Sequence, residues 1–486
     1  MGSPVANAGS DARDNSRATT IVCKFGGTSV GSGERIGNVA RIITDLRAER
    51  GRPPAVVVSA MSGVTDRLIQ AATSAARGDR DTFAQIRQDL ATRHREATLA
   101  CVADANERAQ LLEAQTNLLD WLEMLCGSIA TLGELTPRGL DVVSGLGERL
   151  SARITAAALR SLGTPAEVVE GTEIIVTNGR FGAAMPLWAE TTSRVRERLL
   201  PLLAQGVVPV VTGFIAATRE GIPTTLGRGG SDYTGSVLGR CLPAEEVWIW
   251  TDVSGVMTAD PRVVPNAATL PSITYGEVSE LAFFGAKVLH PKTIQPLADM
   301  GIPVRVLNTF APSESGTLVC QTPDESHLIK GITAIRELSI VAVQGRGMMG
   351  VPGIAGRAFT AVARAGVSIL MITQSSSEQS ICFAIRRADA PEVVAALEEE
   401  FQLEMMRQDV DRVSAQHDVA IVAVVGSGML GRPGIASEVF SALAEREINV
   451  ISIAQGSSEY NLSLVVAQGD ADDAVRAIHE RFGLGK

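Results

Sequence analysis

The sequence predicts an α/β fold, a three-layer αβα sandwich around a mostly parallel sheet, followed by a smaller duplicated α+β module. Short runs rich in Val and Ile alternate with segments of helical spacing, which is typical of parallel strands covered on both faces. Glycine-rich turns follow several of these runs. Residues 340–385 and 421–466 align without gaps and are copies of one unit. The predicted strands of the first part lie at residues 20–23, 55–59, 166–169, 174–176, 207–211 and 247–250.

The composition restricts the classes of function. The formal net charge of −10 and the lack of a long Lys/Arg block argue against a nucleic-acid-binding protein. No apolar run approaches the length of a membrane span, so no membrane partner is expected. The six cysteines are scattered without a C-x-x-C pair. This pattern favours reduced thiols in a cytoplasmic protein over a disulfide framework or a zinc site.

The chain is expected to contain several domains, because 486 residues exceed what one hydrophobic core usually holds. The N-terminal residues lack apolar periodicity and predict a disordered tail. Two copies of the repeat are too few for a solenoid, so a paired module is expected. The predicted division is a tail at 1–19, a catalytic domain at 20–320, a linker at 321–334, and the two copies at 335–415 and 416–486.

Residues 24–30, Lys-Phe-Gly-Gly-Thr-Ser-Val, follow the first predicted strand and lead into a helix with apolar positions between residues 36 and 46. A glycine turn between a strand and a helix presents backbone N–H groups to one point, which suits a phosphate. Lys24 adds a mobile positive charge. The glycines fit neither the Walker loop nor the dinucleotide fingerprint. A tight turn with a surface lysine is the alternative interpretation.

Two further loops carry polar side chains after predicted strands or at helix starts. Residues 59–65 form a small-residue loop with hydroxyl groups that suits a small polar ligand, or an ordinary helix N-cap. Residues 144–151 place Glu148 in a glycine-flanked turn, which is also compatible with a plain helix start.

The loop at residues 224–234 is the strongest signal after the opening segment. Its glycines allow close approach to a ligand, and Arg228 offers a planar fork for a carboxylate or phosphate. Helix capping by Asp232 does not explain the glycines before it. The later segments 250–262 and 284–291 add further charged residues. The cations are Lys24, Arg228, Arg262 and Lys287, and the anions are Glu148 and Asp232. Phosphoryl transfer needs such cations around phosphates bridged by Mg²⁺.

In this order and spacing the motifs resemble those of the aspartate kinases (aspartokinases) of the amino-acid kinase family, over about residues 20–486. The matching segments are KFGGTSV at 24–30, SAMSGVTD at 59–66, GERLS at 147–151, RFG at 180–182, GFIA at 213–216, TTLGRGGSDYT at 224–234, WTDVSGVMTADPR at 250–262 and ELAFFGAKVLHP at 280–291. The repeat resembles the family's paired ferredoxin-like ACT domains. Its QSSSE and QGSSE turns, at 374–378 and 455–459, are most similar to the kinase portion of threonine-sensitive aspartokinase–homoserine dehydrogenases. No dehydrogenase segment follows before Lys486, and whether the native gene continues into one is left open.

The resemblance implies that ATP and L-aspartate give ADP and 4-phospho-L-aspartate, the first step of lysine, threonine and methionine biosynthesis. Mg²⁺ is expected to be held mainly by the ATP phosphates. The implied catalytic residues are Lys24, Gly27 and Asp232. The implied aspartate-binding residues are Thr65, Glu148, Phe214, Arg228 and Ser231. The implied nucleotide-binding residues are Lys24, Gly26, Gly27, Thr251, Asp252, Met257, Arg262 and Lys287. Met257 stands where many relatives have a tyrosine.

The resemblance also implies an amino-acid effector, with threonine favoured over lysine, and a homodimer or homotetramer formed through the ACT domains. The implied effector-binding residues are Met348, Gly350, Gln374, Met429, Gly431 and Gln455. Simple packing of a duplicated module is the alternative for these loops. The alternatives for the whole chain are a kinase for glutamate or N-acetylglutamate, a non-catalytic amino-acid sensor, and a truncated bifunctional enzyme.

Overall fold

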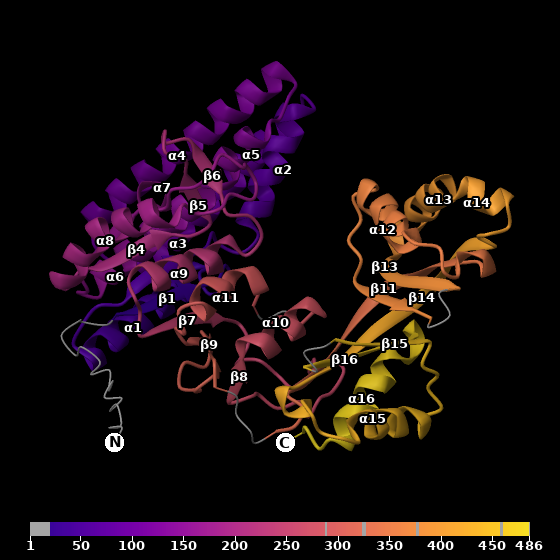
Figure 1. Cartoon of the computed structure of the whole chain (residues 1–486). Helices are drawn as coiled ribbons and strands as arrows, with labels where there is room; N and C mark the ends of the chain where they lie inside the picture. Colours follow the sequence, from indigo (N-terminus) through magenta and orange to yellow (C-terminus); the bar gives the residue numbers. More distant parts are fainter. Residues whose placement is uncertain (1–19, 287–288, 323–326, 376–378, 457–459, 486) are drawn as a thin grey trace, which may run out of the picture. The chain divides into compact units, whose positions relative to one another are not determined.

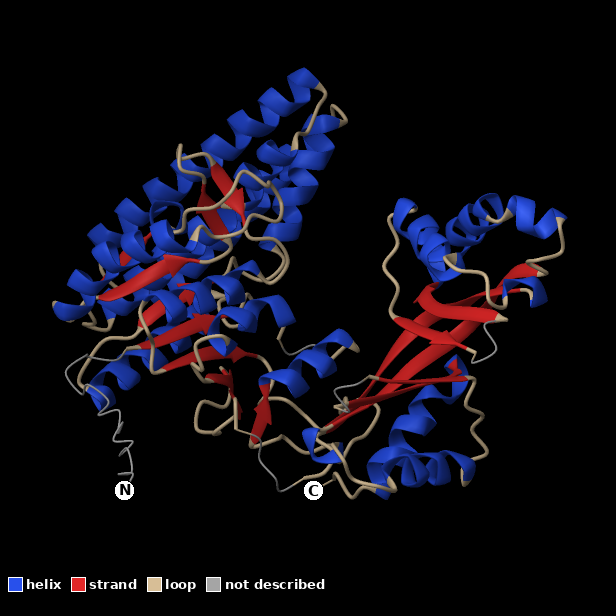
Figure 2. Ribbon diagram, viewed as in Figure 1, coloured by secondary structure: helices blue, strands red, loops and turns tan. Residues whose placement is uncertain are grey.

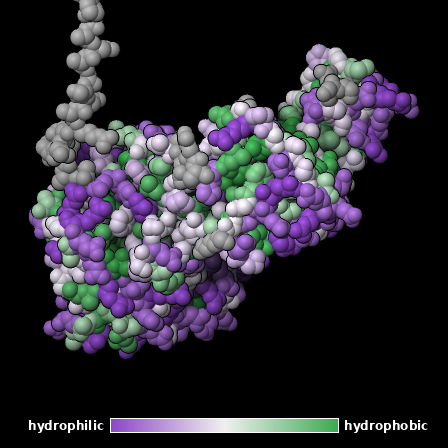
Figure 3. All heavy atoms as spheres, turned by 90° about the horizontal axis from the view of Figure 1, so that it is seen from below, coloured by the Kyte–Doolittle hydropathy of each residue, from purple (hydrophilic) through white to green (hydrophobic). Residues whose placement is uncertain are grey.

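The computed structural model describes residues 20–286, 289–322, 327–375, 379–456 and 460–485 (Figure 1). The chain divides into two compact units, Met1–Thr251 and Asp252–Lys486. The predicted tail at 1–19 lies outside the described residues. No described helix is long and apolar enough to cross a membrane. On the face shown in Figure 3, hydrophilic residues cover much of the surface and apolar residues form patches between them.

The first unit is built on parallel strands in the order β3-β4-β2-β1-β7. Every residue of β1 and β4 is buried, so both faces of these strands are covered. Helices α6 and α8 each contact β4, and α9 contacts β1 (Figure 2). This arrangement confirms the predicted mostly parallel sheet with helices around it. The strands are β1 (Ile21–Phe25), β2 (Ala55–Val58), β3 (Ala166–Val169), β4 (Val208–Thr212), β5 (Ile215–Ala217), β6 (Pro223–Thr225) and β7 (Glu246–Thr251).

Helix α1 illustrates how the helices of the first unit are bounded by their sequence. The Ser32 side chain accepts the Arg35 N–H at the start of α1, and Gly51 ends that helix in the left-handed conformation. The helices are α1 (Gly33–Arg50), α2 (Val64–Ala76), α3 (Arg80–Cys101), α4 (Ala105–Leu132), α5 (Pro137–Ser144), α6 (Leu146–Ser161), α7 (Gly171–Ile174), α8 (Trp188–Ala204) and α9 (Gly230–Cys241).

One predicted strand is wrong. Residues 174–176 are not a strand, because Gly171–Ile174 form a single helical turn and Val176 makes only an isolated bridge to Ala217. The Gly171 N–H donates to the Thr212 hydroxyl at 2.7 Å, and a side chain at Gly171 would collide with the backbone. This close approach holds the chain in a turn at a position where Val and Ile alone suggested a strand.

The second unit begins with short elements and continues into the repeat. The repeat forms one antiparallel sheet in the order β12-β13-β11-β14-β16-β15, with β11 and β14 paired at its centre (Figure 1). Its strands and the strands before it are β8 (Ser272–Thr274), β9 (Val304–Asn308), β10 (Thr317–Cys320), β11 (Gly331–Gln344), β12 (Met371–Gln374), β13 (Ser380–Arg386), β14 (Arg412–Val425), β15 (Ser452–Gln455) and β16 (Asn461–Ala467). The helices are α10 (Tyr275–Phe283), α11 (Pro291–Ala298), η1 (Arg346–Met348), α12 (Ile354–Arg364), η2 (Arg387–Asp389), α13 (Ala390–Glu400), α14 (Gln402–Met406), η3 (Ser427–Met429), α15 (Ile435–Ala444), η4 (Gln468–Asp470) and α16 (Ala471–Arg481).

The two copies differ in what their hydrophobic cores contain. The core of the first copy is formed by residues between Val341 and Val410. The core of the second copy also includes Ala259, Val264 and Ala267, which come before the first strand of the repeat in the chain. This shared core places residues 252–330 in the same compact unit as the repeat. The domain boundaries inferred from the sequence remain a prediction.

Candidate active site

Lys24 and Asp232 form an ion pair at the end of the central strand. Lys24 is the penultimate residue of β1, and its Nζ lies 2.5 Å from Oδ1 of Asp232 in the first turn of α9. The two side chains are 8% and 23% exposed. A side chain at Gly235 would sit 3.3 Å from the Lys24 Cβ, so this glycine lets α9 approach β1 closely. The pair therefore fixes a partly buried cation beside the glycine turn.

The glycine turn is held by backbone hydrogen bonds to two neighbouring segments. The Gly26 N–H donates to the Trp250 carbonyl and the Ser62 N–H donates to the Gly27 carbonyl, both at 3.1 Å. A Cβ at Gly27 would lie 2.9 Å from the Ala60 carbonyl oxygen. The turn at 24–31 and the loop at 59–65 thus lie against each other, as the predicted edge of a parallel sheet requires.

Glu148 brings a buried carboxyl to the same region. It lies in the first turn of α6 and is only 3% exposed. Burial raises the pKa of Glu148 to about 8, although the Ala60 backbone N–H and the positive charge of Lys24 act in the opposite direction. Its Oε2 has no hydrogen-bond partner among the described residues. A buried, unpaired acceptor suits the ammonium group of a small ligand.

Phe214 and Ser231 come together through two glycines. A Cβ at Gly213 would lie 2.7 Å from the Ser231 Cβ, and one at Gly230 would lie 2.7 Å from the Phe214 ring. Phe214 adopts a positive φ of 68°, a strained conformation for this residue, and its N–H donates to the Thr234 hydroxyl. The segment after β4 is therefore fixed against the start of α9, directly beside Asp232.

Arg228 and Thr65 complete the residues inferred for aspartate. Arg228 is exposed and has no hydrogen bond or ion pair among the described residues. Thr65 lies half-buried in the first turn of α2. Arg228 therefore has its planar donors free for a carboxylate.

The residues inferred for the nucleotide are divided between the units. Thr251 ends β7 in the first unit, whereas Asp252, Met257 and Arg262 belong to the second unit. Arg262 is 78% exposed and pairs with Asp260, with 2.6 Å between Nη2 and Oδ2. Met257 packs partly against the core of the second copy. Lys287 lies outside the described residues, so the nucleotide contacts of this set stay a prediction.

Asp141 is a functional candidate that sequence reasoning missed. It lies in α5, is 3% exposed, and accepts the N–H groups of Gly182 and Thr225, both at 2.9 Å, and the Thr225 hydroxyl at 2.7 Å. Asp141 thereby ties the loop at 180–182 to the loop that carries Arg228. Its partners lie 41 and 84 residues away, and no local pattern could have revealed them.

Each copy of the repeat contains a cavity, and the two cavities lie at equivalent positions. The cavity of the first copy, about 280 Å³, and that of the second, about 390 Å³, are each bounded by a glycine-rich loop, the start of a helix and two strands. Three of the residues inferred for an effector line each one. These are Met348, Gly350 and Gln374 in the first copy, and Met429, Gly431 and Gln455 in the second. The main chemical difference is Arg432 in the second cavity where the first has Val351.

A buried carboxylate joins the loop of the second cavity to the short elements before the repeat. Glu277 is fully buried in the first turn of α10, and its Oε1 accepts the Ser427 N–H at 2.7 Å. Its Oε2 accepts the Thr274 N–H and so completes a capping box. Ser427 opens the 3₁₀ turn that ends at Met429. The cavity loop of the second copy is thus fixed by a side chain from outside the repeat.

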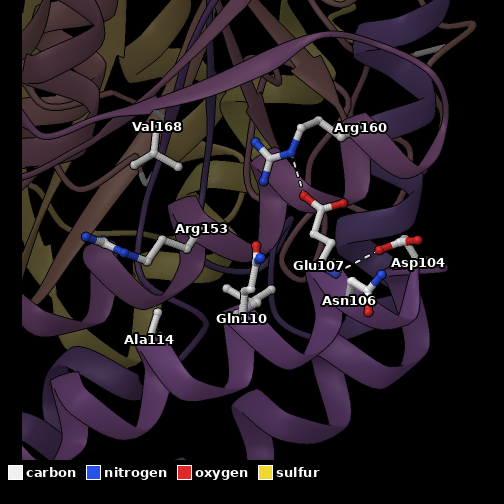
Figure 4. Close-up of a pocket in the computed structure, with 9 residues that line it drawn as sticks. Asp104, Asn106, Glu107, Gln110, Ala114, Arg153, Arg160 and Val168 are labelled. Carbon is white, nitrogen blue, oxygen red and sulfur yellow. Dashed lines mark hydrogen bonds and ion pairs between the residues drawn. The ribbon is translucent and has the colours of Figure 1, made fainter.

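A larger cavity of about 600 Å³ lies elsewhere, between α4, α6 and β3 (Figure 4). Its charged residues bond to one another or to neighbours: Glu107 pairs with Arg160, Asp104 caps α4, and Arg153 pairs with Glu170. These groups are satisfied within the protein, in keeping with the solvated helix faces of this region. The cavity contains none of the inferred site residues.

No group of three or more His, Cys, Asp or Glu residues that could hold a metal ion occurs in the described part of the chain. The donors near the Lys24–Asp232 pair are instead backbone N–H groups and single side chains. Binding of Mg²⁺ mainly through the ATP phosphates stays a prediction.

Comparison with known proteins gives the family. Residues 19–308 match the amino acid kinase family, and residues 341–401 and 422–482 each match an ACT domain. The chain is 38% identical over 471 residues to a chloroplastic bifunctional aspartokinase/homoserine dehydrogenase 1 of Zea mays, covering 96% of this chain and 50% of that protein. It therefore spans about half the length of the curated relatives it matches.

Solved structures agree with this assignment. E. coli aspartokinase III in complex with aspartate and ADP is similar, with a TM-score of 0.76 and 30% identity over 96% of this chain and 100% of that chain. The same enzyme in complex with lysine and aspartate gives a TM-score of 0.75 at 30% identity, over 95% and 99%. On these matches, the chain belongs to the amino acid kinase family, among the aspartokinases with C-terminal ACT domains.

Proposed function

We propose that the protein transfers the γ-phosphoryl group of ATP to the side-chain carboxylate of L-aspartate, giving ADP and 4-phospho-L-aspartate. The observation that carries the proposal is the Lys24–Asp232 pair beside the Gly26–Gly27 turn, with the buried carboxyl of Glu148 nearby, whose Oε2 has no partner among the described residues. The similar E. coli enzyme binds aspartate and ADP. The reaction would open a route to lysine, threonine and methionine.

The chemistry needs positioning and charge neutralisation more than proton transfer. The aspartate side-chain carboxylate is ionised at neutral pH, so its oxygen attacks phosphorus without a general base. One P–O bond forms to aspartate as the bond to ADP breaks. Mg²⁺ bound with ATP would offset the negative charge of the phosphates. Lys24 and the backbone of Gly27 would hold the transferring group, and Asp232 would orient Lys24. Gly26, whose N–H donates to the Trp250 carbonyl, would fix the turn beside the nucleotide.

The acceptor side uses groups of opposite charge for the two ends of the amino acid. Arg228 would bind the α-carboxylate and Glu148 the ammonium group, so that the side chain points toward the phosphoryl group. Thr65, Phe214 and Ser231 would line the same pocket. On the nucleotide side, Thr251, Asp252, Met257, Arg262 and Lys287 stay inferred contacts.

A coupled assay with ATP and a panel of acidic amino acids tests the proposal. Turnover of aspartate that is lost in Lys24→Ala, while nucleotide binding is largely retained, supports it. Turnover of glutamate or N-acetylglutamate in place of aspartate would show a different kinase of this family. Absence of turnover with every acceptor would favour a non-catalytic sensor.

We further propose that an amino-acid effector binds the two repeat cavities and inhibits the enzyme, with threonine favoured over lysine. The glutamines Gln374 and Gln455 at equivalent positions support a polar effector. The similar E. coli enzyme binds lysine, so lysine is the competing effector. Titrating activity with each amino acid decides between them, and inhibition by lysine alone would refute the threonine proposal.

A homodimer or homotetramer formed through the ACT domains and a cytoplasmic location complete the proposal. Sedimentation of the protein with and without effector tests the assembly. A monomer under both conditions would contradict it.

A further inference from the structure

Arg93 bridges the two loops that meet at the candidate active site. It projects from α3, and its Nη1 donates to the Ser62 carbonyl at 2.7 Å while its Nη2 donates to the Gly31 carbonyl at 3.1 Å. The side chain is half-buried, and desolvation lowers its pKa from the ordinary value. No carboxylate lies within ion-pair distance of Arg93 among the described residues. Its guanidinium group thus binds two backbone carbonyl oxygens.

The helix that carries Arg93 is fixed closely against α1. A Cβ at Gly33 would lie 2.5 Å from the Ala97 carbonyl oxygen, so α3 touches the first turn of α1 at this glycine. Ala97 is one helical turn beyond Arg93. The adjacent His94 is fully buried, with its Nδ1 2.7 Å from the Leu90 carbonyl oxygen. The guanidinium group therefore projects from a rigid support, not from a free helix face.

The two loops also contact each other directly, so Arg93 closes a small ring of hydrogen bonds. The Ser62 N–H donates to the Gly27 carbonyl, and the Ser62 carbonyl accepts from Arg93. Arg93 then reaches Gly31, four residues beyond Gly27. Ser62 is thereby fixed at both its N–H and its carbonyl. The segment 24–31 on the phosphate side and the segment 59–65 on the acceptor side are locked in one arrangement.

We propose that Arg93 is a positioning residue for phosphoryl transfer, which sets the distance between the phosphate-side loop and the acceptor-side loop. This inference rests on the proposed function. In-line attack requires the reacting atoms to be held close, and a misplacement of about 1 Å can cost on the order of 10²-fold in rate. The planar fork of arginine can serve both carbonyls, whereas a lysine ammonium serves one well.

Steady-state kinetics of Arg93→Met and Arg93→Lys test the role, with Arg87→Met as the matched control. Arg87 lies on the same helix but pairs with Asp120 and Glu123 at the surface. We expect kcat to fall about 10–100-fold in Arg93→Met while both KM values change by less than about threefold. Arg93→Lys should recover part of kcat, and Arg87→Met should stay within about twofold of the parent.

Hydrogen–deuterium exchange of the ligand-free protein gives a readout that does not depend on activity. Exchange in a peptide covering residues 59–65 should rise in Arg93→Met and not in Arg87→Met. Unchanged kcat with unchanged exchange in folded Arg93→Met would overturn the proposal, as would an equal loss of kcat in Arg87→Met. If the parent protein does not turn over aspartate, the proposed reaction fails, while the exchange data still decide whether Arg93 locks the loops.

Discussion

The candidate active site and the two repeat cavities are both built on glycine-rich turns after strands, yet they differ in how far their polar side chains are buried. Lys24, Glu148 and Asp141 are all less than a tenth exposed. Lys24 pairs with Asp232 on another element, and Asp141 accepts hydrogen bonds from distant loops. Glu148 is enclosed by the protein interior. In the repeat cavities, Gln374, Gln455 and Arg432 are exposed. The candidate active site thus fixes Lys24, Glu148 and Asp141 in advance and leaves Arg228 exposed, whereas the repeat cavities leave all three of these polar groups in contact with solvent.

This difference fits the phosphoryl transfer and the effector binding proposed for the two kinds of site. Phosphoryl transfer is accelerated most by charges that need no reorganisation when the transition state forms. The gain in rate offsets the free-energy cost of burying those charges. An effector site must change between empty and occupied forms with a modest free-energy difference, which open polar groups allow. Variants at both sites test whether the candidate active site depends on fixed charge to a greater degree than the repeat cavities do.

The largest effect is expected at Lys24. Lys24→Ala should lower kcat on the order of 10²–10³-fold, because a fixed cation facing the phosphates is lost. It also leaves the Asp232 carboxylate without its partner, so the melting temperature should fall. The double variant Lys24→Met/Asp232→Asn should recover the melting temperature but not kcat. Recovery of both would show that the pair serves the fold alone.

Glu148 should give the next largest effect, and that effect depends on pH through the protonation state of its carboxyl group. Because burial raises its pKa to about 8, the ligand-free protein holds this proton at neutral pH. The stability that this neutral carboxyl contributes is complete below its ordinary pKa of 4.5 and is lost as the pH rises through about 8. Pairing with the ammonium of aspartate requires the ionised form, so binding should release about one proton at pH 7.

Calorimetry in two buffers of different ionisation enthalpy measures that proton release. Glu148→Gln should bind aspartate about 10–100-fold more weakly and release no proton. A parent protein whose apparent binding enthalpy is the same in both buffers would contradict the role of Glu148.

The fold could be predicted from the sequence, and the residues proposed for the candidate active site stand in short local motifs. Lys24 lies at the end of β1 and the loop at 59–65 follows β2, so the parallel-sheet rule brings these two segments to one edge. Glu148 instead lies at the start of α6, directly after α5, and Asp232 follows the separate β5–β6 pair. Asp141 and Arg93 could not be predicted, because they bind distant loops mainly through backbone groups, whose positions depend on the tertiary fold. The shared core of Ala259 with the second copy was hidden for the same reason, since it depends on tertiary packing.

A smaller effect is expected at Glu277, which joins the second cavity loop to α10. Glu277→Ala leaves the N–H groups of Ser427 and Thr274 without their acceptor and should destabilise the protein by about 1–3 kcal/mol. Inhibition by the effector should weaken more than basal activity does, because the loop of the second cavity loses its outside contact. Denaturant unfolding and inhibition curves check both statements. Equal loss of activity with and without effector would assign Glu277 to the fold only.

The smallest effect is expected from exchanging the one residue that makes the two cavities chemically different. Arg432 gives the second cavity an exposed cation that can attract an effector carboxylate, and Val351 gives the first none. Exposed charge pairs contribute about 0.2–1 kcal/mol, so Arg432→Val should raise the effector concentration for half-inhibition by about two- to fivefold. Val351→Arg is the reciprocal control and should lower that concentration. The shift should shrink at high salt, because an exposed pair is screened. A shift of similar size at all salt concentrations would mean that Arg432 acts through packing and not through its charge.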